Sequence, residues 1–557
     1  MINTHIQQKN FENKFYLFDQ SIVRNAENTY IKQSDVEKVI TNASWVDQYS
    51  WTPDSGIPDW EHRVSIMYPN VEYDEETKKY KIWYHALNSD SPTDEYRWRD
   101  NLIDKNNSKN VKLDGFNNTA KGVIHEGHDV LCYMESEDGI NWVRPELGEF
   151  FYKTRRGEII GTNIAYIGMH GLGIHKNENP DSGEPKYLMA GRTWDTDSLD
   201  ARGEPIGVAI SFSDDGIHWE DPITIKTAYD CASDLYYVRA DTHNQLIWST
   251  EKNKYVVITR GYLKNVSGIR VVAYMESTAD LESIRVLQKE KCTGGIKYWD
   301  KTAKYWSTPE IVLDKNVTAD FQPYSMPFTH LANGYYVGIA SMANFEKGEI
   351  GIWNSVHAEL TWSPDAKIWQ YIDKGNPFIK NAKEFSLSPG NDYGMIYCAA
   401  PVTVEDRTEI FYAATPELHY IKYGDIPENI KQIVDEKIPK AAKAEAVTRT
   451  STLNIARIKK DCYAGIWAEN GHIMTEAFEV TGDDLRITAD IADGGSLTIE
   501  ILDSDDNVVC AFCKNSTDKT VYDISMLKGK SVYFKIFLKN ASVYAISGNI
   551  KIGRNFI

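Results

Sequence analysis

The chain has 557 residues, of which 42% are hydrophobic and 25% are charged, and its net charge is −19. This length predicts two to four domains, or fewer if one is a large all-β unit, and the composition is typical of a soluble globular protein with a sizeable core. The negative charge and the lack of a long Lys/Arg run argue against nucleic-acid or anionic-membrane partners. Aromatic residues make up 12% of the chain, which favours a β-rich protein or one that stacks rings on sugars.

The N-terminal segment, MINTHIQQKNFENKF, is polar, and no run of about 18 apolar residues follows it. We therefore expect neither a signal peptide nor a membrane-spanning helix, and a cytoplasmic location. Short apolar runs broken by Gly, Asn, Asp and Pro then recur along the chain and predict strands, as in 78–86, 253–262, 333–342 and 407–415. One helix is expected over 427–446, ended or kinked at Pro439.

A motif of Ser, Asp-Gly and Trp repeats between these strands. MESEDGINWVRP (134–145) is matched by SFSDDGIHWEDP (211–222), and weaker copies lie at 274–284, 360–372 and 411–421. A repeat of four short strands per unit is typical of a β-propeller blade, so five copies predict five blades. One substrate meets one catalytic centre, so a recurring group is expected to be structural, with Asp-Gly forming a positive-φ turn and Ser and Asp capping its amides. This structural role is assigned to Ser136, Asp138, Trp142, Ser213, Asp215 and Trp219.

After about residue 447 the pattern changes to strict alternation, in segments such as GSLTIEILDSDDN (495–507) and SVYFKIFLKN (531–540). Clean alternation between turn residues predicts an antiparallel β-sandwich. Its inward residues are expected to be Leu497, Ile499, Ile501, Val532, Phe534, Ile536 and Leu538. The predicted fold is thus all-β, a five-bladed β-propeller over 1–440 followed by a β-sandwich over 447–557.

Seven cysteines stand at irregular positions, 132, 231, 292, 398, 462, 510 and 513. Cys510 and Cys513 form a CxxC without a second pair, so we expect strand and turn positions rather than a zinc site. Buried, reduced thiols are the general expectation for the seven.

Several segments resemble a broad bacterial group akin to glycoside hydrolase families 32 and 43. They are FYLFDQSIV (15–23), YPNVEYDEETKKYKIWY (68–84), the motif block at 136–148, GTNIAYIG (161–168), ADTHNQLIW…KYVVITR (240–260) and RIKKDCYAGIWA…GHIMTEAFEV (457–480). The resemblance spans nearly the whole chain and implies sugar binding at one end of a propeller channel. The W-M-N-D-P-N-G motif of invertases and a clear R-D-P are absent, which argues against fructosidase activity.

Glycoside hydrolysis needs one protonated and one ionised carboxyl group, so acids on or before the innermost strands are the candidates. Asp59 and Glu61 precede a strand, and Asp241 and His243 precede another; polar groups at such positions are expected to be paired or functional. These four are the predicted catalytic residues, with an Asx-turn cap as the alternative role of Asp241. A third carboxyl is left open among Asp320, Glu384 and Asp392.

The substrate-binding candidates share ring-stacking or hydrogen-bonding side chains near the same strands. They are Trp60, Arg63, Asn163, His175, Arg192, Arg260 and Asp392. Arg239 and Arg260 either bind substrate or pair with Asp241, and His175 stands where the resembled group leads us to expect an acid. The insertion 86–128 either walls the pocket or forms an oligomer contact.

We predict a glycoside hydrolase that cleaves a small oligosaccharide or glycoside with two carboxylates at the channel mouth. Two alternatives stay open: a glycoside phosphorylase, with Arg63, Arg192 and Arg260 converging on phosphate, and a non-catalytic carbohydrate-binding propeller. The expected partner is a small carbohydrate, without nucleic acid or membrane, and a homo-oligomer is left open. No metal site and no cofactor are predicted, because His125, Glu126 and His128 lack a partner set, although a structural divalent cation in the channel stays an alternative.

Overall fold

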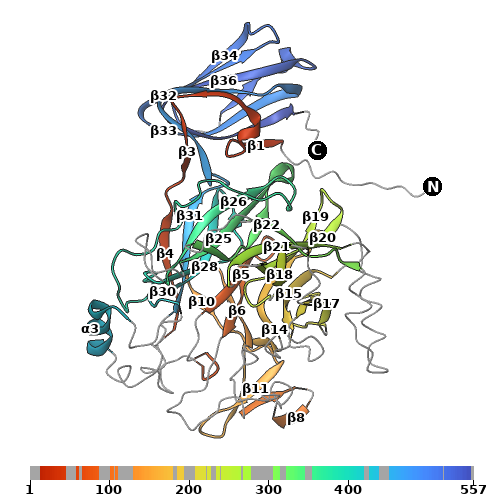
Figure 1. The fold of residues 1–557 in the computed structure, drawn as a ribbon, viewed down its shortest axis with the longest axis vertical. Coiled ribbons are helices and arrows are strands. Elements are labelled where there is room, and N and C mark those ends of the chain that lie inside the picture. Colours follow the sequence, from red (N-terminus) through yellow and green to blue (C-terminus); the bar gives the residue numbers. More distant parts are fainter. Residues whose placement is uncertain are drawn as a thin grey trace, which may run out of the picture.

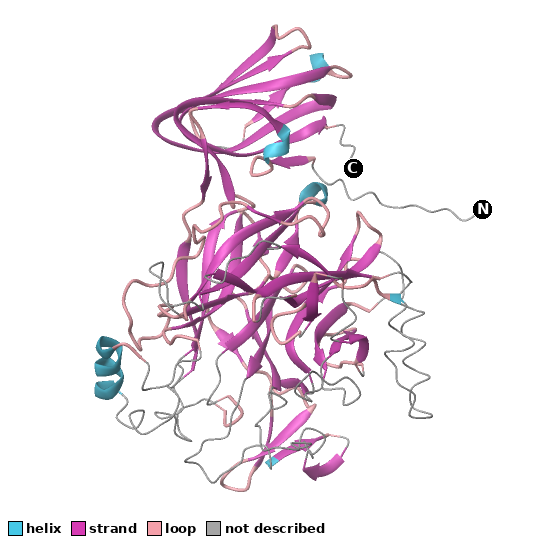
Figure 2. Cartoon of the chain, viewed as in Figure 1, coloured by secondary structure: helices cyan, strands magenta, loops and turns pink. Residues whose placement is uncertain are grey.

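The computed structural model describes most of the chain. The described residues are 13–45, 58–61, 66–86, 101–105, 107–110, 130–167, 169–179, 185–193, 207–220, 222–227, 232, 234–238, 240–264, 268–277, 305–313, 321–344, 354–419, 426–437, 451–517 and 520–552. Strands dominate this part of the chain, as Figure 2 shows, so the predicted all-β class is confirmed. None of the described helices has the length and apolar character needed to cross a bilayer.

Three consecutive sheets form the first part of the larger body (Figure 1). The first contains β5 (Ile66–Asp74), β6 (Lys79–Ala86), β9 (Val130–Ser136) and β10 (Trp142–Val143), with β13 (Ile164–Ile167) paired to β9. The second contains β14 (Met169–Lys176), β15 (Tyr187–Thr193), β16 (Gly207–Ser213) and β17 (Ile223–Thr227). In the third, β18 (Leu235–Val238) and β19 (Gln245–Ser249) pair with β20 (Lys254–Leu263), followed by β21 (Arg270–Glu276) and β22 (Glu310–Leu313).

A ten-stranded sheet completes this body in two halves. The first half holds β23 (Phe321–Ser325), β24 (Phe328–His330), β25 (Tyr336–Asn344), β26 (Val356–Ser363) and β27 (Gln370–Tyr371). The second holds β28 (Met395–Cys398), β29 (Val402–Val404), β30 (Arg407–Thr415), β31 (Ser451–Lys459) and β4 (Glu37–Trp45). The halves join through one pair, Val356 opposite Met395. A separate small sheet contains β7 (Leu102–Asp104), β8 (Asn107–Asn110), β11 (Phe150–Lys153) and β12 (Ile159–Gly161).

The C-terminal sheet forms the other lobe of the molecule, at the top of Figure 1. Its strands are β1 (Lys14–Tyr16), β2 (Val23–Glu27), β3 (Tyr30–Gln33), β32 (Ala464–Thr475), β33 (Phe478–Leu502), β34 (Val508–Lys514), β35 (Val521–Asp523) and β36 (Ser531–Lys551). Its core includes all seven predicted inward residues, which are confirmed as buried: Leu497, Ile499, Ile501, Val532, Phe534, Ile536 and Leu538. Alternation therefore identified the buried face of this sheet correctly.

The strand pairing differs from the predicted division of the chain in two places. Strands β1, β2 and β3, near the N-terminus, pair with β36 and β32 of the C-terminal sheet. Strand β31, which begins at Ser451 and was assigned to the second domain, instead lies between β30 and β4. An alternating pattern specifies which face of a strand is buried but not which distant strand pairs with it, so these pairings could not be predicted from the sequence.

The repeated motif forms a hydrogen-bonded turn, as expected. Asp138 Oδ1 accepts hydrogen bonds from the amides of Ile140 and Asn141 at 2.8 and 2.7 Å, and Trp142 Nε1 donates to the carbonyl of Gly139 at 2.9 Å. Burial alone would raise the pKa of Asp138, but these amide donors outweigh it and lower that pKa to about 2. The copies at 213–219 and 363–369 repeat this geometry, so the structural role of the motif is confirmed.

Few helices accompany the strands. Helix α3 (Glu428–Lys437) begins one residue after the start of the predicted segment and ends two residues before Pro439. The short 3-10 helices are η1 (Gln20–Ile22), η6 (Ala332–Gly334) and η9 (Ser525–Leu527). Of the described cysteines, three are buried, Cys510 is half-buried and Cys513 is exposed. The last two lie in β34, which confirms a strand position but corrects the expectation that every thiol is buried.

Candidate functional site

Segments of three successive sheets meet around Asp241. The carbonyl oxygen of Asp241, just before β19, accepts hydrogen bonds from Tyr68 Oη of β5 at 3.4 Å and from His170 Nε2 of β14 at 3.1 Å. Asn70 of β5 donates from Nδ2 to the carbonyl of Leu172 in β14 at 3.0 Å. Three segments from three sheets are thus tied together at this point.

The segment that carries Asp241 is held in a fixed conformation. Ala240 has a φ of 53°, in the left-handed region that side-chain-bearing residues rarely adopt. Asn244 compensates by donating from Nδ2 to the carbonyls of Gly171, Ala240 and Thr242 at 2.7, 2.9 and 2.5 Å. A buried, strained segment held by one amide is typical of a functional loop.

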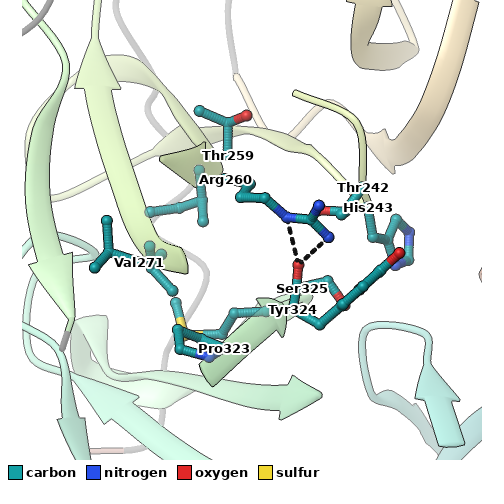
Figure 3. A pocket seen from close by; sticks show the side chains of 11 residues that line it. Thr242, His243, Thr259, Arg260, Val271, Pro323, Tyr324 and Ser325 are labelled. Atoms are coloured by element: carbon teal, nitrogen blue, oxygen red, sulfur yellow. Dashed lines mark hydrogen bonds between the residues drawn. The ribbon is translucent and has the colours of Figure 1, made fainter. Parts of the chain in front are cut away.

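Asp241 and Arg260 form a buried ion pair. Arg260 Nη1 lies 2.7 Å from Asp241 Oδ1. Arg260 is 4% exposed and Asp241 is 9% exposed. Nε and Nη2 of Arg260 donate to the carbonyl of Tyr324 at 3.3 and 3.1 Å (Figure 3), and the guanidinium lies 4.1 Å from the centre of the Tyr324 ring. Burial would lower the pKa of Arg260, but Asp241 and the nearby tyrosines hold it well above its usual value. Arg260 therefore links Asp241 to the ten-stranded sheet as a permanent cation.

Histidine rings surround Tyr68, which itself has a positive φ of 55°. The rings of His85, His170 and His243 lie 5.9, 5.9 and 5.6 Å from the Tyr68 ring, measured between centres. Burial, with a smaller effect of His175, lowers the pKa of His243 to about 3, so this imidazole is neutral near pH 7. Its Nε2 lies 2.8 Å from Asn70 Oδ1, an acceptor, which places the proton on Nε2. His243, a predicted catalytic residue, thus lies beside Tyr68 and holds Asn70 through this hydrogen bond.

Residues of the ten-stranded sheet also lie at this point. The Tyr324 ring lies 5.3 Å from the Tyr397 ring, and His419 Nε2 lies 3.1 Å from Tyr324 Oη. We name the residues joined directly around Asp241 the Asp241 cluster: Tyr68, His170, Asp241, Arg260 and Tyr324. Sequence reasoning missed Tyr68, His170 and His419, because no local pattern distinguishes them from core residues.

A small cavity lies beside the Asp241 cluster, with space for about one water molecule. Thr242, Arg260 and Ser325 are among its lining residues, as Figure 3 shows. The hydroxyls of Thr242 and Ser325 are buried and have no hydrogen-bond partner within the described residues. Since buried hydroxyls are normally satisfied, the cavity offers two polar contacts to a bound molecule.

A second polar group of predicted residues forms around Glu61, which is fully buried. Arg144 donates to its carboxylate from Nε and Nη2 at 2.9 and 2.8 Å, and Tyr84 Oη donates at 2.6 Å. Asn163 Nδ2 donates to Glu61 at 3.0 Å, while Asn163 Oδ1 accepts from Trp60 Nε1 at 2.8 Å. We name these five residues the Glu61 cluster. It brings together three candidate residues, Trp60, Glu61 and Asn163, and Arg144 is a partner that the sequence did not reveal.

The remaining predicted residues are members of neither cluster or fall outside the described residues. Asp59 accepts from Tyr152 Oη at 2.6 Å, and His175 contacts Gln245. Asp392 pairs with Lys38 at 2.5 Å and accepts from Tyr412 Oη at 3.0 Å. Arg192 is fully buried in β15, and Glu384 is exposed. The residues outside the described part of the chain are Arg63, Arg239, Asp320, His125, Glu126 and His128.

A metal centre was not predicted. Within the described ranges, no group of three or more His, Cys, Asp and Glu side chains is placed to hold a metal ion.

Comparisons with known proteins give distant structural similarities. No protein-family model matches the chain, and no curated protein matches it. Solved structures that resemble it include an N-acetylgalactosamine deacetylase from F. plautii in complex with blood group B trisaccharide. The two chains are 13% identical with a TM-score of 0.41, and the match covers 77% of this chain and 97% of the deacetylase chain. Another is a glycoside hydrolase family 32 β-fructofuranosidase of Bombyx mori, with 9% identity and a TM-score of 0.34 over 92% and 94% of the two chains. A third is an α-L-arabinanase of Penicillium chrysogenum complexed with arabinobiose, with 12% identity and a TM-score of 0.35 over 75% and 98%.

Proposed function

We propose that the chain is a glycoside hydrolase whose active site is built around Asp241. In this proposal the three sheets and the two halves of the ten-stranded sheet are the five blades of a propeller. The C-terminal sheet, with β1, β2 and β3, is a β-sandwich accessory domain. Pairing of β4 with β31 supports this view, because it closes the last blade with a strand from the N-terminal part of the chain.

The observation that carries the proposal is the buried pair of Asp241 and Arg260 at the point where segments of three sheets meet. A carboxylate that is removed from water and oriented by a fixed cation is suited to stabilise an oxocarbenium-like transition state or to activate water. Asn244 and the ring of His170 hold the segment in place, so the carboxylate is positioned before substrate arrives.

The second carboxyl of the proposed mechanism must hold a proton at the working pH. Glu61 is poorly suited, because Arg144 already occupies its carboxylate with two hydrogen bonds. Glu417 is the candidate for this role: it is 4% exposed, follows β30, and lies two positions before His419, which contacts Tyr324. Its Oε2 accepts a hydrogen bond from the hydroxyl of Thr415.

A small carbohydrate is the proposed substrate. The face of a sugar ring carries C–H groups that pack on aromatic rings, and its hydroxyls need charged or amide partners. Tyr324, Tyr68 and Tyr397 supply rings around Asp241 and Arg260. These rings are buried and the cavity beside Asp241 has space for about one water molecule, so in this proposal the rings move apart when a sugar unit enters.

The test is a turnover assay of the purified full-length protein with a panel of p-nitrophenyl glycosides, each in the α and β form. We expect release of p-nitrophenol from at least one member at a rate that is the same with and without inorganic phosphate. A rate that requires phosphate would show a phosphorylase instead. Binding of sugars without turnover of any member would show a non-catalytic propeller.

A further inference from the structure

Two open hollows lie on the C-terminal sheet, in the other lobe from the Asp241 cluster. One has a volume of about 670 Å³ and the other of about 360 Å³, both within the range of small-ligand sites. Trp467 and Asn540 line both hollows, so the two are continuous across these side chains. The result is an elongated groove, which we name the Trp467 groove.

The aromatic floor of the Trp467 groove is the indole of Trp467, which lies outside the hydrophobic core. Trp467 is half-buried, and its ring lies 5.2 Å from the ring of Tyr30, which is 56% exposed. Neither ring belongs to the hydrophobic core cluster of the C-terminal sheet in the described structure. Tyr30 lies directly opposite Trp467 in the paired strand, and Lys32 Nζ lies 5.9 Å from the centre of the indole ring. The part of the indole that stays accessible is a suitable surface for the C–H face of a sugar ring.

The sides of the groove supply hydrogen-bonding groups that suit hydroxyls. Asn28, Asn470 and Asn540 all line the larger hollow, and each amide both donates and accepts. Asn28, between β2 and β3, and Asn540, within β36, have φ values of 53° and 42°, in the left-handed conformation that asparagine tolerates. The three side-chain amides are therefore available at one hollow to bind hydroxyl groups.

The charges along the groove balance, although the whole chain is strongly acidic. Three lysines and three acids line the two hollows, and these are Lys32, Lys459, Lys539, Asp35, Asp490 and Glu469. Lys459 also pairs directly with Asp490. A groove without net charge favours a neutral ligand over a sulfated or uronate chain, and over a basic peptide.

From the aromatic floor, the amides and the balanced charge, we infer that the Trp467 groove binds a neutral oligosaccharide or polysaccharide chain, with one sugar ring stacked on Trp467. This goes beyond the proposed function, since binding here does not depend on catalysis at Asp241. The groove would hold a polymer on the accessory lobe while the other lobe acts on short chains.

Affinity electrophoresis of the full-length protein tests this inference. The gels contain arabinan, galactan, xylan, galactomannan or soluble starch, and polygalacturonate serves as the acidic comparison. We expect at least one neutral polymer to slow the wild-type protein, and Trp467→Ala to raise the dissociation constant at least ten-fold. Asn470→Ala provides a second variant with the indole intact, expected to weaken binding several-fold even if the Trp467 variant folds poorly.

Two controls separate this inference from the proposed function. Tyr533→Ala removes another aromatic ring of the same sheet, which packs under Arg24 rather than in the groove, and should bind as the wild type does. Asp241→Asn should also keep full binding. Migration unchanged by every neutral polymer, slowing by polygalacturonate alone, or binding that survives Trp467→Ala would overturn the inference.

Discussion

Arg260 joins Asp241 to the carbonyl of Tyr324, 64 residues further along the chain, through one guanidinium group. The contact links the segment between β18 and β19 of the third sheet to β23 of the ten-stranded sheet. Both charged groups are almost completely buried, so removing either one leaves the other as a buried charge without a partner, which is destabilising. Stability and the proposed chemistry therefore depend on the same contact.

Replacing the cation alone should destabilise the protein strongly. Arg260→Met leaves a buried carboxylate without its counter-charge, which costs about 3–5 kcal/mol of unfolding free energy. Guanidinium denaturation would measure this, and adding Asp241→Asn should recover part of the loss. Lys105→Met, which breaks the more exposed pair with Glu149, should cost less than about 1 kcal/mol. Equal losses for the two single variants would contradict the buried-pair interpretation.

The amide of Asn244 should be essential for the conformation of the segment before β19. Asn244→Ala removes the donor to three carbonyls and the acceptor for Thr259 Oγ1, which lies 2.6 Å from Oδ1. Leaving such buried groups unsatisfied costs about 1–3 kcal/mol each, so we expect a loss of at least about 2 kcal/mol in chemical denaturation. Thr259→Val, which removes only the donor to Oδ1, should cost less. A negligible effect of Asn244→Ala would show that the backbone holds this segment without the amide.

Alanine should be tolerated far less at Gly216, in the motif turn, than at Gly148, which also has a positive φ. Gly216 has a φ of 81°, and a Cβ there would lie 2.5 Å from Cζ2 of Trp83. Gly148 has a φ of 76° with nothing within 4 Å of such a Cβ. Both variants cost about 1–2 kcal/mol for the left-handed backbone, and Gly216→Ala adds the clash. Thermal melting should therefore fall further for Gly216→Ala, and equal shifts would contradict the packing of Trp83 on this turn.

The ion pair of His330 and Glu251 should make stability depend on pH. Burial would lower the pKa of His330, but Glu178 and Glu251 outweigh it and raise that pKa to about 9 from an ordinary 6.5. Its contribution is fully present below pH 6.5 and is lost as the pH rises through 9. The melting temperature of the wild type minus that of His330→Gln should thus be largest near pH 6 and vanish by about pH 10. A difference that stays constant over this range would contradict the pairing.

Sequence reasoning identified the local structure of this protein well. The strand predicted at 407–415 is β30 with the same limits, and the turn role of Asp138 follows from its residue type and spacing. The pairing of Arg260 with Asp241 was one of two roles considered for that arginine, and the structure shows it. Local patterns succeed here because strand alternation and turn chemistry are set within a few residues.

Contacts between distant segments were not predictable in the same way. Arg144 and Glu61 are 83 positions apart, and nothing in either segment points to the other. The pairing of β1 with β36 joins the two ends of the chain, which an alternating pattern does not specify. Tyr68 reads as an ordinary strand residue, and only its position among three histidines reveals its place in the Asp241 cluster.

The most direct test of the account is the turnover of Asp241→Asn on the best glycoside from the panel, compared with Asp74→Asn. Asp74 is also a largely buried aspartate with a cationic partner, Lys81 at 2.8 Å, but it lies in a hairpin turn of the first sheet. We expect both variants to fold, kcat/KM to fall by at least about a thousand-fold for Asp241→Asn, and Asp74→Asn to stay within a few-fold of the wild type. Full activity of a folded Asp241→Asn protein would contradict the central claim.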